Sequence, residues 1–491
     1  METELNIHRY DRQLLIKDWD QSKLSKGIVT IVGSNNLSLY SALPLAALGV
    51  GTIRIIDSSN GLDTDKLLDI SLAGKSKVKS LEEALKKINP NINIISIHSD
   101  LSTSAAQYFL EGSNVIIDAT NDKISKSHVL ANYSKINIPT ISASSDETKG
   151  KITLFYNQKP SPAGLMPMFE GKQQGDLVSL LLGGVIAEET KKLLMNEKNL
   201  LSKVYNYNLE SNDRFSHISD RIINTKDDIF DDKKILMVGA GALGCFLGPA
   251  TVNNLKAGQL DILDYDTVEE HNLNRQVCFY NAVGKLKAES LVQTLKRMNK
   301  KMNINPIVTK FDENFSPNTK YDLIFDAVDS FFTKAMLHNF AKKNLIPIVS
   351  GGTDYRASTV LVYSPGKTSC FDCQINLYEL AIKAEIIRRT SCIQAPNPSV
   401  IMTNQIAGAL MVAEARSVLR PDLYGNPIDG EIKFISDLDS RGGINRLESI
   451  CDCHTKEIRP LILPDTERVN VVEKKIDGEL IQEIYLDGRK L

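Results

Sequence analysis

The sequence has little net charge, no long apolar run and no cysteine among its first 244 residues, and these absences exclude several classes of protein. Because 58 basic residues nearly balance 60 acidic ones, nothing indicates a polyanionic partner or an electrostatic attachment to membranes. No apolar run approaches the roughly 20 residues that a membrane helix needs, and the charged N-terminal segment lacks the apolar core of a signal peptide. We therefore expect a cytoplasmic protein, and 491 residues predict two or three domains.

The cysteines are placed unevenly, since all seven lie at or beyond Cys245. Four of them form two close pairs, Cys370/Cys373 and Cys451/Cys453. In a large cytoplasmic chain such pairs indicate a metal site sooner than disulfides. Their absence from the first half indicates that the two halves differ in role.

The chain repeats itself at an offset of about 205 to 210 residues, and such a repeat determines how the whole fold is interpreted. Five pairs of segments correspond: Arg9-Tyr10 with Arg214-Phe215, Ile55-Ile56-Asp57 with Ile262-Leu263-Asp264, Gly74-Lys75-Ser76-Lys77 with Gly284-Lys285-Leu286-Lys287, Val115–Asp118 with Leu323–Asp326, and Ile138-Pro139-Thr140 with Ile346-Pro347-Ile348.

Each copy alternates short apolar β-rich runs with helical periods, which predicts an α/β fold with a doubly wound parallel sheet. The apolar stretches Leu177–Leu194 and Ile401–Leu419 predict a buried helix late in each copy. The polar segment Asn196–Lys234 separates the copies. We therefore expect two Rossmann-like domains in a pseudo-twofold arrangement, residues 1–205 and 206–455, and a tail, 456–491, with a small β appendage.

A glycine-rich turn follows the strand Ile235–Val238 in the second copy. It has the form GxGxxG, with Gly239, Gly241 and Gly244, and Asp264 ends the next strand. The glycines permit a tight turn and close phosphate approach, the helix N-terminus offers free N–H groups, and the acid binds ribose hydroxyls. Taken alone, this fingerprint also fits a nicotinamide or flavin enzyme.

Four further elements follow Asp264 in order: Asn272-Leu273-Asn274-Arg275-Gln276, Gly284, Lys287 and Asp326-Ala327-Val328-Asp329. With this series, residues 234 to 455 resemble the adenylation domain of the ThiF/MoeB/ubiquitin-activating superfamily. The resemblance implies ATP-dependent adenylation of a carboxylate, which requires negative charge on the triphosphate to be neutralised.

The resemblance also implies roles for individual residues. Asp264 would bind the ribose and Asp329 would hold Mg²⁺, while three residues would contact the phosphates: Asn272, Arg275 and Lys287. Three neighbours are interpreted as structural: Gln276 as support, Lys285 as a solvated lysine at a helix start, and Asp326 as a strand-end residue.

The first copy lacks this phosphate-binding set. Asn35 and Ser38 stand where the second and third glycines would be, and Asn121 stands where the second copy has Asp329. No N-L-x-R-Q segment follows Asp57, although Asp57 and Lys77 are present. Since side chains at the glycine positions obstruct pyrophosphate, we expect this half to be catalytically inactive.

The N-terminal segment Arg9-Tyr10-Asp11-Arg12-Gln13 resembles the R-Y-x-R-Q segment with which family members send an arginine into the partner subunit's ATP site. The second copy has Arg214-Phe215-Ser216-His217 at the aligned place and lacks this arginine. The resemblance implies that Arg12 reaches the γ-phosphate held by the second half. The alternative is that Arg12 merely caps a surface helix.

Cys370-Phe371-Asp372-Cys373 resembles the first half of the family's structural zinc site. The implied ligands are Cys370, Cys373, Cys451 and Cys453, a set that suits tetrahedral Zn²⁺. The second pair is one residue tighter than the usual C-x-x-C, which leaves open whether the adjacent His454 replaces a cysteine. Complete loss of the metal is the other alternative.

Cys392 follows Arg388 and Arg389, whose charges favour a reactive thiolate. Family members often use a cysteine here to accept the adenylated carrier as a thioester or to handle sulfur as a persulfide. The alternative is a non-catalytic loop thiol. Cys245 and Cys278 are interpreted as small core residues.

The sequence as a whole predicts an enzyme that uses ATP, Mg²⁺ and Zn²⁺ to adenylate the C-terminus of a ubiquitin-like or sulfur-carrier protein with a flexible tail. A downstream conjugating or sulfur-transfer protein is a further expected partner. Two alternatives stay open: adenylation of a ribosomal peptide in natural-product maturation, and an NAD-dependent oxidoreductase.

Overall fold

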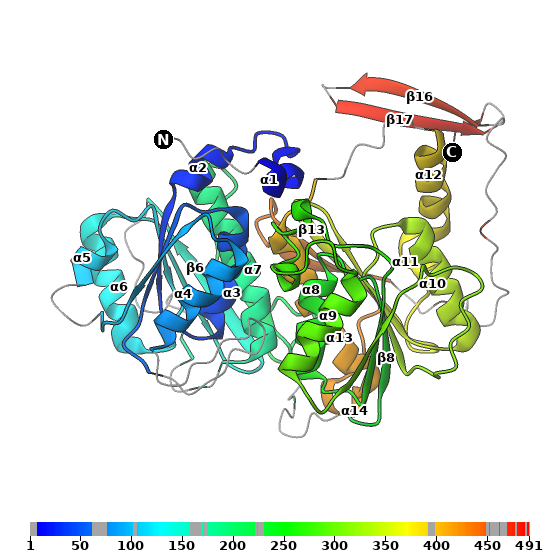
Figure 1. The fold of residues 1–491 in the computed structure, drawn as a ribbon, viewed down its shortest axis with the longest axis horizontal. Helices are drawn as coiled ribbons and strands as arrows, with labels where there is room; N and C mark the ends of the chain where they lie inside the picture. Colours follow the sequence, from blue (N-terminus) through cyan, green and yellow to red (C-terminus); the bar gives the residue numbers. More distant parts are fainter. Residues whose placement is uncertain are drawn as a thin grey trace.

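The protein consists of two α/β halves side by side, with a small sheet at the end of α12 (Leu377–Thr390) of the second half (Figure 1). The computed structural model describes residues 7–60, 76–101, 106–157, 168–169, 172, 174–220, 223, 230–390, 398–447, 451, 461, 469–476, 479–486 and 489–490. Among these residues, no helix combines the length and the apolarity that crossing a bilayer requires.

The first half contains a sheet whose described strands have the order β3-β2-β1-β4-β5-β6-β7. β1 to β5 are parallel, and β6 and β7 continue the sheet antiparallel. The strands are β1 (Ile28–Val32), β2 (Thr52–Ile56), β3 (Asn93–Ile97), β4 (Val115–Asp118), β5 (Thr140–Ser145), β6 (Lys149–Phe155) and β7 (Tyr205–Asn208). The helices are α1 (Ile7–Leu14), α2 (Gln21–Lys26), α3 (Asn36–Leu48), α4 (Lys77–Ile88), α5 (Ala106–Leu110), α6 (Lys123–Ile136) and α7 (Asp176–Met195).

The second half repeats this order as β10-β9-β8-β11-β12-β13-β14-β15 within the described residues. The strands are β8 (Lys234–Val238), β9 (Gln259–Leu263), β10 (Asn303–Ile307), β11 (Leu323–Asp326), β12 (Ile348–Thr353), β13 (Ala357–Tyr363), β14 (Gly430–Ile435) and β15 (Gly442–Arg446). The helices are α8 (Gly244–Asn254), η2 (Glu270–Asn272), η3 (Val277–Phe279), α9 (Lys287–Met298), α10 (Phe331–Asn344), α11 (Phe371–Ile375), α12 (Leu377–Thr390), α13 (Ile401–Leu419) and α14 (Pro421–Tyr424).

The parallel strands of both sheets have the doubly wound order 3-2-1-4-5. The central ones are short Ile- and Val-rich runs buried along their length, such as Val115–Asp118, because helices cover both faces of such a sheet. The predicted fold class is confirmed. The edge strand β7, which pairs with β6, runs across the expected domain boundary at residue 205.

An equivalent buried Lys–Asp ion pair lies at the end of the fourth strand of each half, β4 and β11. Lys126 Nζ lies 2.8 Å from Asp118 Oδ2, and Lys334 Nζ lies 3.1 Å from Asp326 Oδ2. Each lysine also donates to a carbonyl oxygen of the adjacent strand, Lys334 to that of Gly351 at 2.6 Å. Asp326 is thus a strand-end residue held by its own lysine, as predicted.

The boundary between the halves is formed by α3, α7, α8 and α13. A Cβ on Gly183 of α7 would lie 2.5 Å from the carbonyl carbon of Tyr40 on α3, and one on Gly184 would lie 2.7 Å from Ile406 Cγ1 on α13. Gln405 of α13 donates across the boundary to the carbonyl oxygen of Tyr40 at 2.9 Å. The two predicted buried helices therefore form the contact between the halves.

Two buried arginines cross this boundary in mirrored fashion. Arg441, in the turn after β14, lies 2.9 Å from Glu189 of α7, and Arg214, in the turn after β7, lies 2.7 Å from Glu414 of α13. Both backbones are left-handed, with φ of 54° and 63° respectively. Each half therefore inserts one arginine against an acid of the other half's long helix, as a pseudo-twofold arrangement requires.

This equivalence corrects one correspondence inferred from the sequence. Arg214 is the counterpart of Arg441 and not of Arg9, which lies on α1 and donates to the carbonyl oxygen of Leu273 at 3.2 Å. The pairs were matched because each precedes the first strand of a repeat, but Arg9 lies on a helix and Arg214 in a turn, so their structural settings differ.

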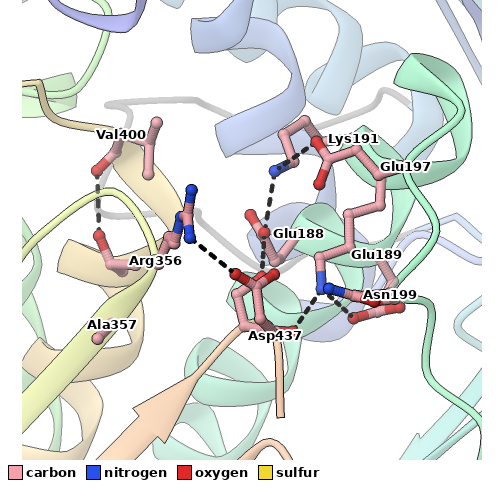
Figure 2. Close-up of polar contacts among 12 residues, drawn as sticks. Glu188, Glu189, Lys191, Glu197, Asn199, Arg356, Ala357, Val400 and Asp437 are labelled. Atoms are coloured by element: carbon pink, nitrogen blue, oxygen red, sulfur yellow. Dashed lines mark hydrogen bonds and ion pairs between the residues drawn. The ribbon is translucent and has the colours of Figure 1, made fainter. Parts of the chain in front are cut away.

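Further charges surround the Arg441 pair. Figure 2 shows Glu188 of α7 joined to Lys191, and Asp437 of the second half joined to Arg356. Glu188 lies 3.0 Å from Lys191 and accepts a hydrogen bond from Ser436 Oγ. The side chains of Glu188 and Glu189 are almost fully buried, so the network requires that the halves stay together.

The C-terminal tail contains an antiparallel sheet of β16 (Val469–Ile476), β17 (Glu479–Leu486) and β18 (Arg489–Lys490), the strands described there. Of the elements of the second half, α12 contacts this sheet through β16. The short alternating runs of the tail thus form the expected β appendage.

Candidate functional site

The glycine turn of the second half joins β8 to α8. Gly239 has a φ of 100°, and a Cβ there would lie 2.6 Å from the carbonyl oxygen of Ala327. A Cβ on Gly244 would lie 2.6 Å from the carbonyl oxygen of Gly239. A Cβ on Gly241 would have no heavy atom of the described chain within 4 Å. Two glycines are therefore required by the backbone, whereas Gly241 faces open space that a ligand could occupy.

Asp264 ends β9 beside this turn. Its Oδ2 accepts the N–H of Ala240 at 2.7 Å, and its Oδ1 accepts the N–H of Asp266 at 2.8 Å. Burial raises the pKa of this carboxyl above its usual range. The two backbone donors fix the carboxylate at the edge of the turn, where an acid binds ribose hydroxyls in dinucleotide folds.

Lys287 is the first residue of α9. Its side chain is mostly buried, and its Nζ lies 2.9 Å from Asp266 Oδ2. The Asp266 side chain is 47% exposed. The ammonium group is thus held near Asp264 by an acid that remains accessible to solvent.

Arg275 lies between η2 and η3. Its Nη1 donates to the carbonyl oxygen of His271 at 2.8 Å and to Asn274 Oδ1 at 2.9 Å. Burial, and then the charge of Arg12, lower the pKa of Arg275 to about 10. The guanidinium therefore remains charged at neutral pH but faces a second positive charge.

The neighbours of Arg275 in the N-L-x-R-Q segment are buried. Asn272 Oδ1 accepts the N–H of Glu269 at 3.0 Å, which closes the η2 turn. Gln276 Oε1 has no hydrogen-bond partner among the residues described. A buried polar atom of this kind fits a site that a polar ligand completes.

Asp329 follows β11 and is exposed. Its charge acts on the pKa of both Arg275 and Tyr265. The structure therefore brings the exposed acid to the same place as the arginine segment and the end of β9.

Helix α1 of the first half packs against η2 of the second. Besides the bond from Arg9 to Leu273, Asn274 Nδ2 donates to Gln13 Oε1 at 3.1 Å. These contacts fix α1 so that the Arg12 charge lowers the pKa of both Arg275 and His271. The structure thus brings α1, which carries Arg12, against the Asn272–Gln276 segment.

The corresponding turn of the first half is closed by its own side chains. Asn35 Oδ1 accepts the N–H of Ser38 at 3.0 Å, and Asn35 Nδ2 donates to the carbonyl oxygen of Ala119 at 2.8 Å. The side chain caps α3 and satisfies an N–H group that an anion would need. Asn121, in the place of Asp329, accepts from Ser144 Oγ at 2.5 Å.

A second element closes the first-half turn from outside. Gln174 Oε1 accepts the N–H of Leu37 at 3.4 Å, and the N–H of Phe169 donates to Ser144 Oγ at 3.1 Å. Asn121 Nδ2 donates to the carbonyl oxygen of Lys172 at 3.3 Å. The chain itself therefore lies across the first-half turn, in contrast to the open space at Gly241.

Three of the predicted metal ligands meet. The sulfur atoms of Cys370, Cys373 and Cys451 lie within 4.8 Å of one another, although Cys451 is 81 residues from Cys370 along the chain. The N–H of Cys370 also donates to Cys451 Sγ at 3.1 Å. Cys453 and His454 lie outside the described residues. Three converging thiols fit a structural Zn²⁺ site, which prefers four such ligands.

Cys392 also lies outside the described residues, between α12 and α13. Cys245 and Cys278 are buried, and Cys278 Sγ donates to the carbonyl oxygen of Cys245 at 3.3 Å. Burial of both fits the prediction that they are core residues.

Sequence reasoning missed Asp266, His271 and Tyr265. Asp266 had a signal, because an acid two residues after Asp264 at a strand end falls on the same edge of the sheet as Lys287. His271 and Tyr265 had none, since their proximity to Arg12 and Asp329 depends on contacts between distant segments.

Comparison with known proteins gave matches in both sequence and structure. UBA4 of Saccharomyces cerevisiae (strain YJM789), an adenylyltransferase and sulfurtransferase, is 30% identical over 207 residues, which is 38% of this chain and 47% of that protein. SUMO-activating enzyme subunit 2 of Dictyostelium discoideum is 30% identical over 169 residues, 33% of this chain and 25% of that protein. The chain therefore spans about half or less of the length of these relatives.

Among solved structures, Escherichia coli MccB with ATP aligns with a TM-score of 0.37 and 22% identity, covering 46% of this chain and 67% of that one. The model of the ThiF family matches the chain twice, over residues 10–226 and 219–448. Because these two matches span both α/β halves, the chain belongs to the ThiF family.

Proposed function

We propose that the second half, completed by Arg12, uses ATP to adenylate the C-terminal carboxylate of a ubiquitin-like or sulfur-carrier protein. The observation that carries the proposal is the open space at Gly241, next to the Ala240 N–H that Asp264 accepts, in a chain whose other turn is closed by Asn35. The yeast and Dictyostelium relatives, an adenylyltransferase and a SUMO-activating subunit by name, support this choice of reaction and substrate.

Each side chain has a task in this reaction. Asp264 binds the ribose hydroxyls, and the phosphates lie against the Gly241 turn with Asn272, Arg275 and Lys287 around them. The carrier's carboxylate oxygen attacks the α-phosphorus, the bond to the β-phosphate bridging oxygen breaks, and pyrophosphate leaves. Positive charge fixed at these positions stabilises the charge that the leaving group gains.

Asp329 is the residue that would hold Mg²⁺, because it is an exposed carboxylate beside Arg275. The bound ion would supply further neutralisation of the triphosphate. Arg12 adds a charge to the terminal phosphates from the first half. Asp266 holds the ammonium group of Lys287 in the free protein. When the nucleotide binds, Lys287 exchanges this carboxylate for phosphate oxygens.

A sulfur nucleophile then attacks the acyl carbon of the acyl-adenylate, the bond to the phosphate oxygen breaks and AMP leaves. Cys392 is our candidate acceptor: its thiolate would form a thioester, or, after a persulfide donor has transferred a sulfur atom to it, its persulfide would form an acyl disulfide. Cys370, Cys373, Cys451 and Cys453 are proposed to hold a structural Zn²⁺ with no direct part in the reaction.

ATP–pyrophosphate exchange with candidate carrier proteins tests the function. The wild type should exchange label in the presence of the right carrier, and Asp329→Ala should not. Exchange with a free peptide and with no carrier of the ubiquitin fold would overturn the proposed substrate. A carrier adduct that disappears with reductant and in Cys392→Ala would identify the acceptor thiol.

A further inference from the structure

Gln13 is the residue of the R-Y-x-R-Q segment that follows Arg12, and the proposed reaction leaves it without a role. It lies on α1 of the first half, and its side chain is fully buried. Its Oε1 accepts a hydrogen bond from Asn274 Nδ2 of the second half at 3.1 Å. Asn274 Oδ1 in turn accepts from Arg275 Nη1 at 2.9 Å. A chain of hydrogen bonds therefore connects α1 with the guanidinium assigned to the triphosphate.

The direction of these hydrogen bonds is fixed within the first half. The carbonyl oxygen of Leu48 can only accept, and it accepts from Gln13 Nε2 at 3.1 Å and from Gln21 Nε2 at 2.9 Å. The indole N–H of Trp19 can only donate, and it donates to Gln21 Oε1 at 3.0 Å. Gln21 Oε1 also accepts from Gln13 Nε2 at 2.6 Å. Because the Gln13 NH₂ group is bound in this way, Gln13 presents its oxygen to Asn274.

The orientation of the Asn274 amide follows from this arrangement. Its NH₂ group faces Gln13 Oε1, so its oxygen faces Arg275 Nη1. A flipped amide would place oxygen against oxygen at Gln13 and N–H against N–H at Arg275. Asn274 is 1% exposed, so water could not replace the two lost hydrogen bonds. Gln13 thus selects the one amide orientation that can accept from Arg275.

The contacts of Arg275 Nη1 leave one edge of the guanidinium for a ligand. Nη1 carries two hydrogens, and it donates to the carbonyl oxygen of His271 and to Asn274 Oδ1. Within the described part of the chain, neither Nε nor Nη2 of Arg275 has a hydrogen-bond partner. The Nε–H and Nη2–H groups form a planar fork that fits two oxygens of a phosphate. The Nη1 contacts therefore set the plane in which this fork is presented.

We propose that Gln13 and Asn274 are positioning residues, which hold the Arg275 guanidinium in the plane in which it binds the triphosphate. The inference rests on the proposed ATP site and not on the identity of the carrier. Neither amide contacts the nucleotide, so the effect of both on ATP binding passes through Arg275. The first half then contributes to the site in two ways, with the charge of Arg12 and with the hydrogen bond that orders Asn274.

Isothermal titration calorimetry of the full chain with MgATP tests the proposal. Gln13→Met keeps the length of the side chain but has no N–H donor and only a weak acceptor. It should bind MgATP roughly 5- to 20-fold more weakly than the wild type, because the Asn274 amide is then free to flip. Asn274→Leu should weaken binding to a similar extent, and the two changes together should be no worse than either alone.

Gln405→Met is the matched control. Gln405 is also fully buried and also donates across the boundary between the halves, to the carbonyl oxygen of Tyr40 at 2.9 Å. It should lower the melting temperature about as much as Gln13→Met does, because each change removes buried hydrogen bonds. Its affinity for MgATP should equal that of the wild type, because Gln405 has no hydrogen bond to the Arg275 segment.

A double-mutant cycle with Arg275→Ala separates positioning from a general loss of structure. Once Arg275 is absent, Gln13→Met should weaken MgATP binding no further. An equal loss in the wild type and in Arg275→Ala would overturn the inference, as would unchanged affinity in Gln13→Met or the absence of ATP binding. Pyrophosphate exchange with a carrier but without this coupling would overturn the positioning role alone. Coupling without exchange for any carrier would overturn only the proposed substrate.

Discussion

Arg12 and Arg275 come from different halves, yet the charge of Arg12 adds to burial in lowering the pKa of Arg275 to about 10. Two like charges held together raise the free energy of the unliganded protein, and an anion between them relieves it. A pair of arginines from the two halves, Arg12 and Arg275, is therefore suited to bind an anion between them.

Arg12→Ala should lower the rate of ATP–pyrophosphate exchange by about 10³-fold, the lower end of the effect of an arginine supplied to a phosphoryl-transfer site. Thermal stability should stay the same or rise, because the repulsion of Arg275 is removed. Arg12→Lys keeps the charge and should retain part of the rate. Full exchange activity in Arg12→Ala would show that the residue only caps a helix.

Two neighbouring glycines should respond to alanine in opposite ways. Gly241→Ala meets open space, so stability should change little while ATP affinity falls. At Gly239 the backbone φ is positive, and the Cβ of an alanine would lie only 2.6 Å from the Ala327 carbonyl oxygen. Gly239→Ala should therefore destabilise the fold. Thermal denaturation and nucleotide titration of both variants separate the two effects. Unchanged ATP affinity in Gly241→Ala would argue against a nucleotide at the turn.

Cys370→Ser should abolish metal binding. The purified wild type should contain about one Zn²⁺ per chain by elemental mass spectrometry, and the variant none. Treatment with a strong chelator should lower the melting temperature of the wild type and leave that of the variant unchanged. Cys278→Ser, at a buried cysteine away from the cluster, should retain the metal. A metal-free wild type would mean that the three thiols serve only packing.

Arg441→Met should cost about 3 kcal/mol in free energy of unfolding, because it removes one of the two cations, Arg441 and Lys192, that lie against the buried carboxylate of Glu189. The matched control is Arg420→Met, which breaks an exposed pair with Asp422 and should cost about 1 kcal/mol or less. Denaturant titration measures both. A similar small effect at both positions would show that the two halves do not depend on the buried pair.

The sequence predicted the two sheets, the long buried helices and the glycine turn because these depend on local patterns. The short length of the apolar run Ile235–Val238 and the glycines that follow it distinguish a buried strand from a helix, and the GxGxxG spacing specifies the turn that follows. The sequence did not predict the equivalent turns that contain Arg214 and Arg441. Their equivalence lies in backbone conformation and in partners some 200 to 250 residues away, which no local pattern records.

The same distinction applies to the site. Asp264 and Lys287 were predicted from their motif and lie beside the turn. The closure of the first-half turn was predicted only in part. The replacement of glycine by Asn35 was visible in the sequence, whereas the contacts of Phe169 and Gln174 over the turn come from a segment that has no motif.

Because Arg12 and Arg275 belong to one polypeptide, the site that they form is not subject to an association equilibrium. When two such parts are supplied by separate subunits, dilution dissociates them and the composite site is lost. Here the covalent connection keeps the effective concentration of one half near the other constant. Specific activity should therefore be independent of protein concentration down to the level at which the enzyme can still be detected.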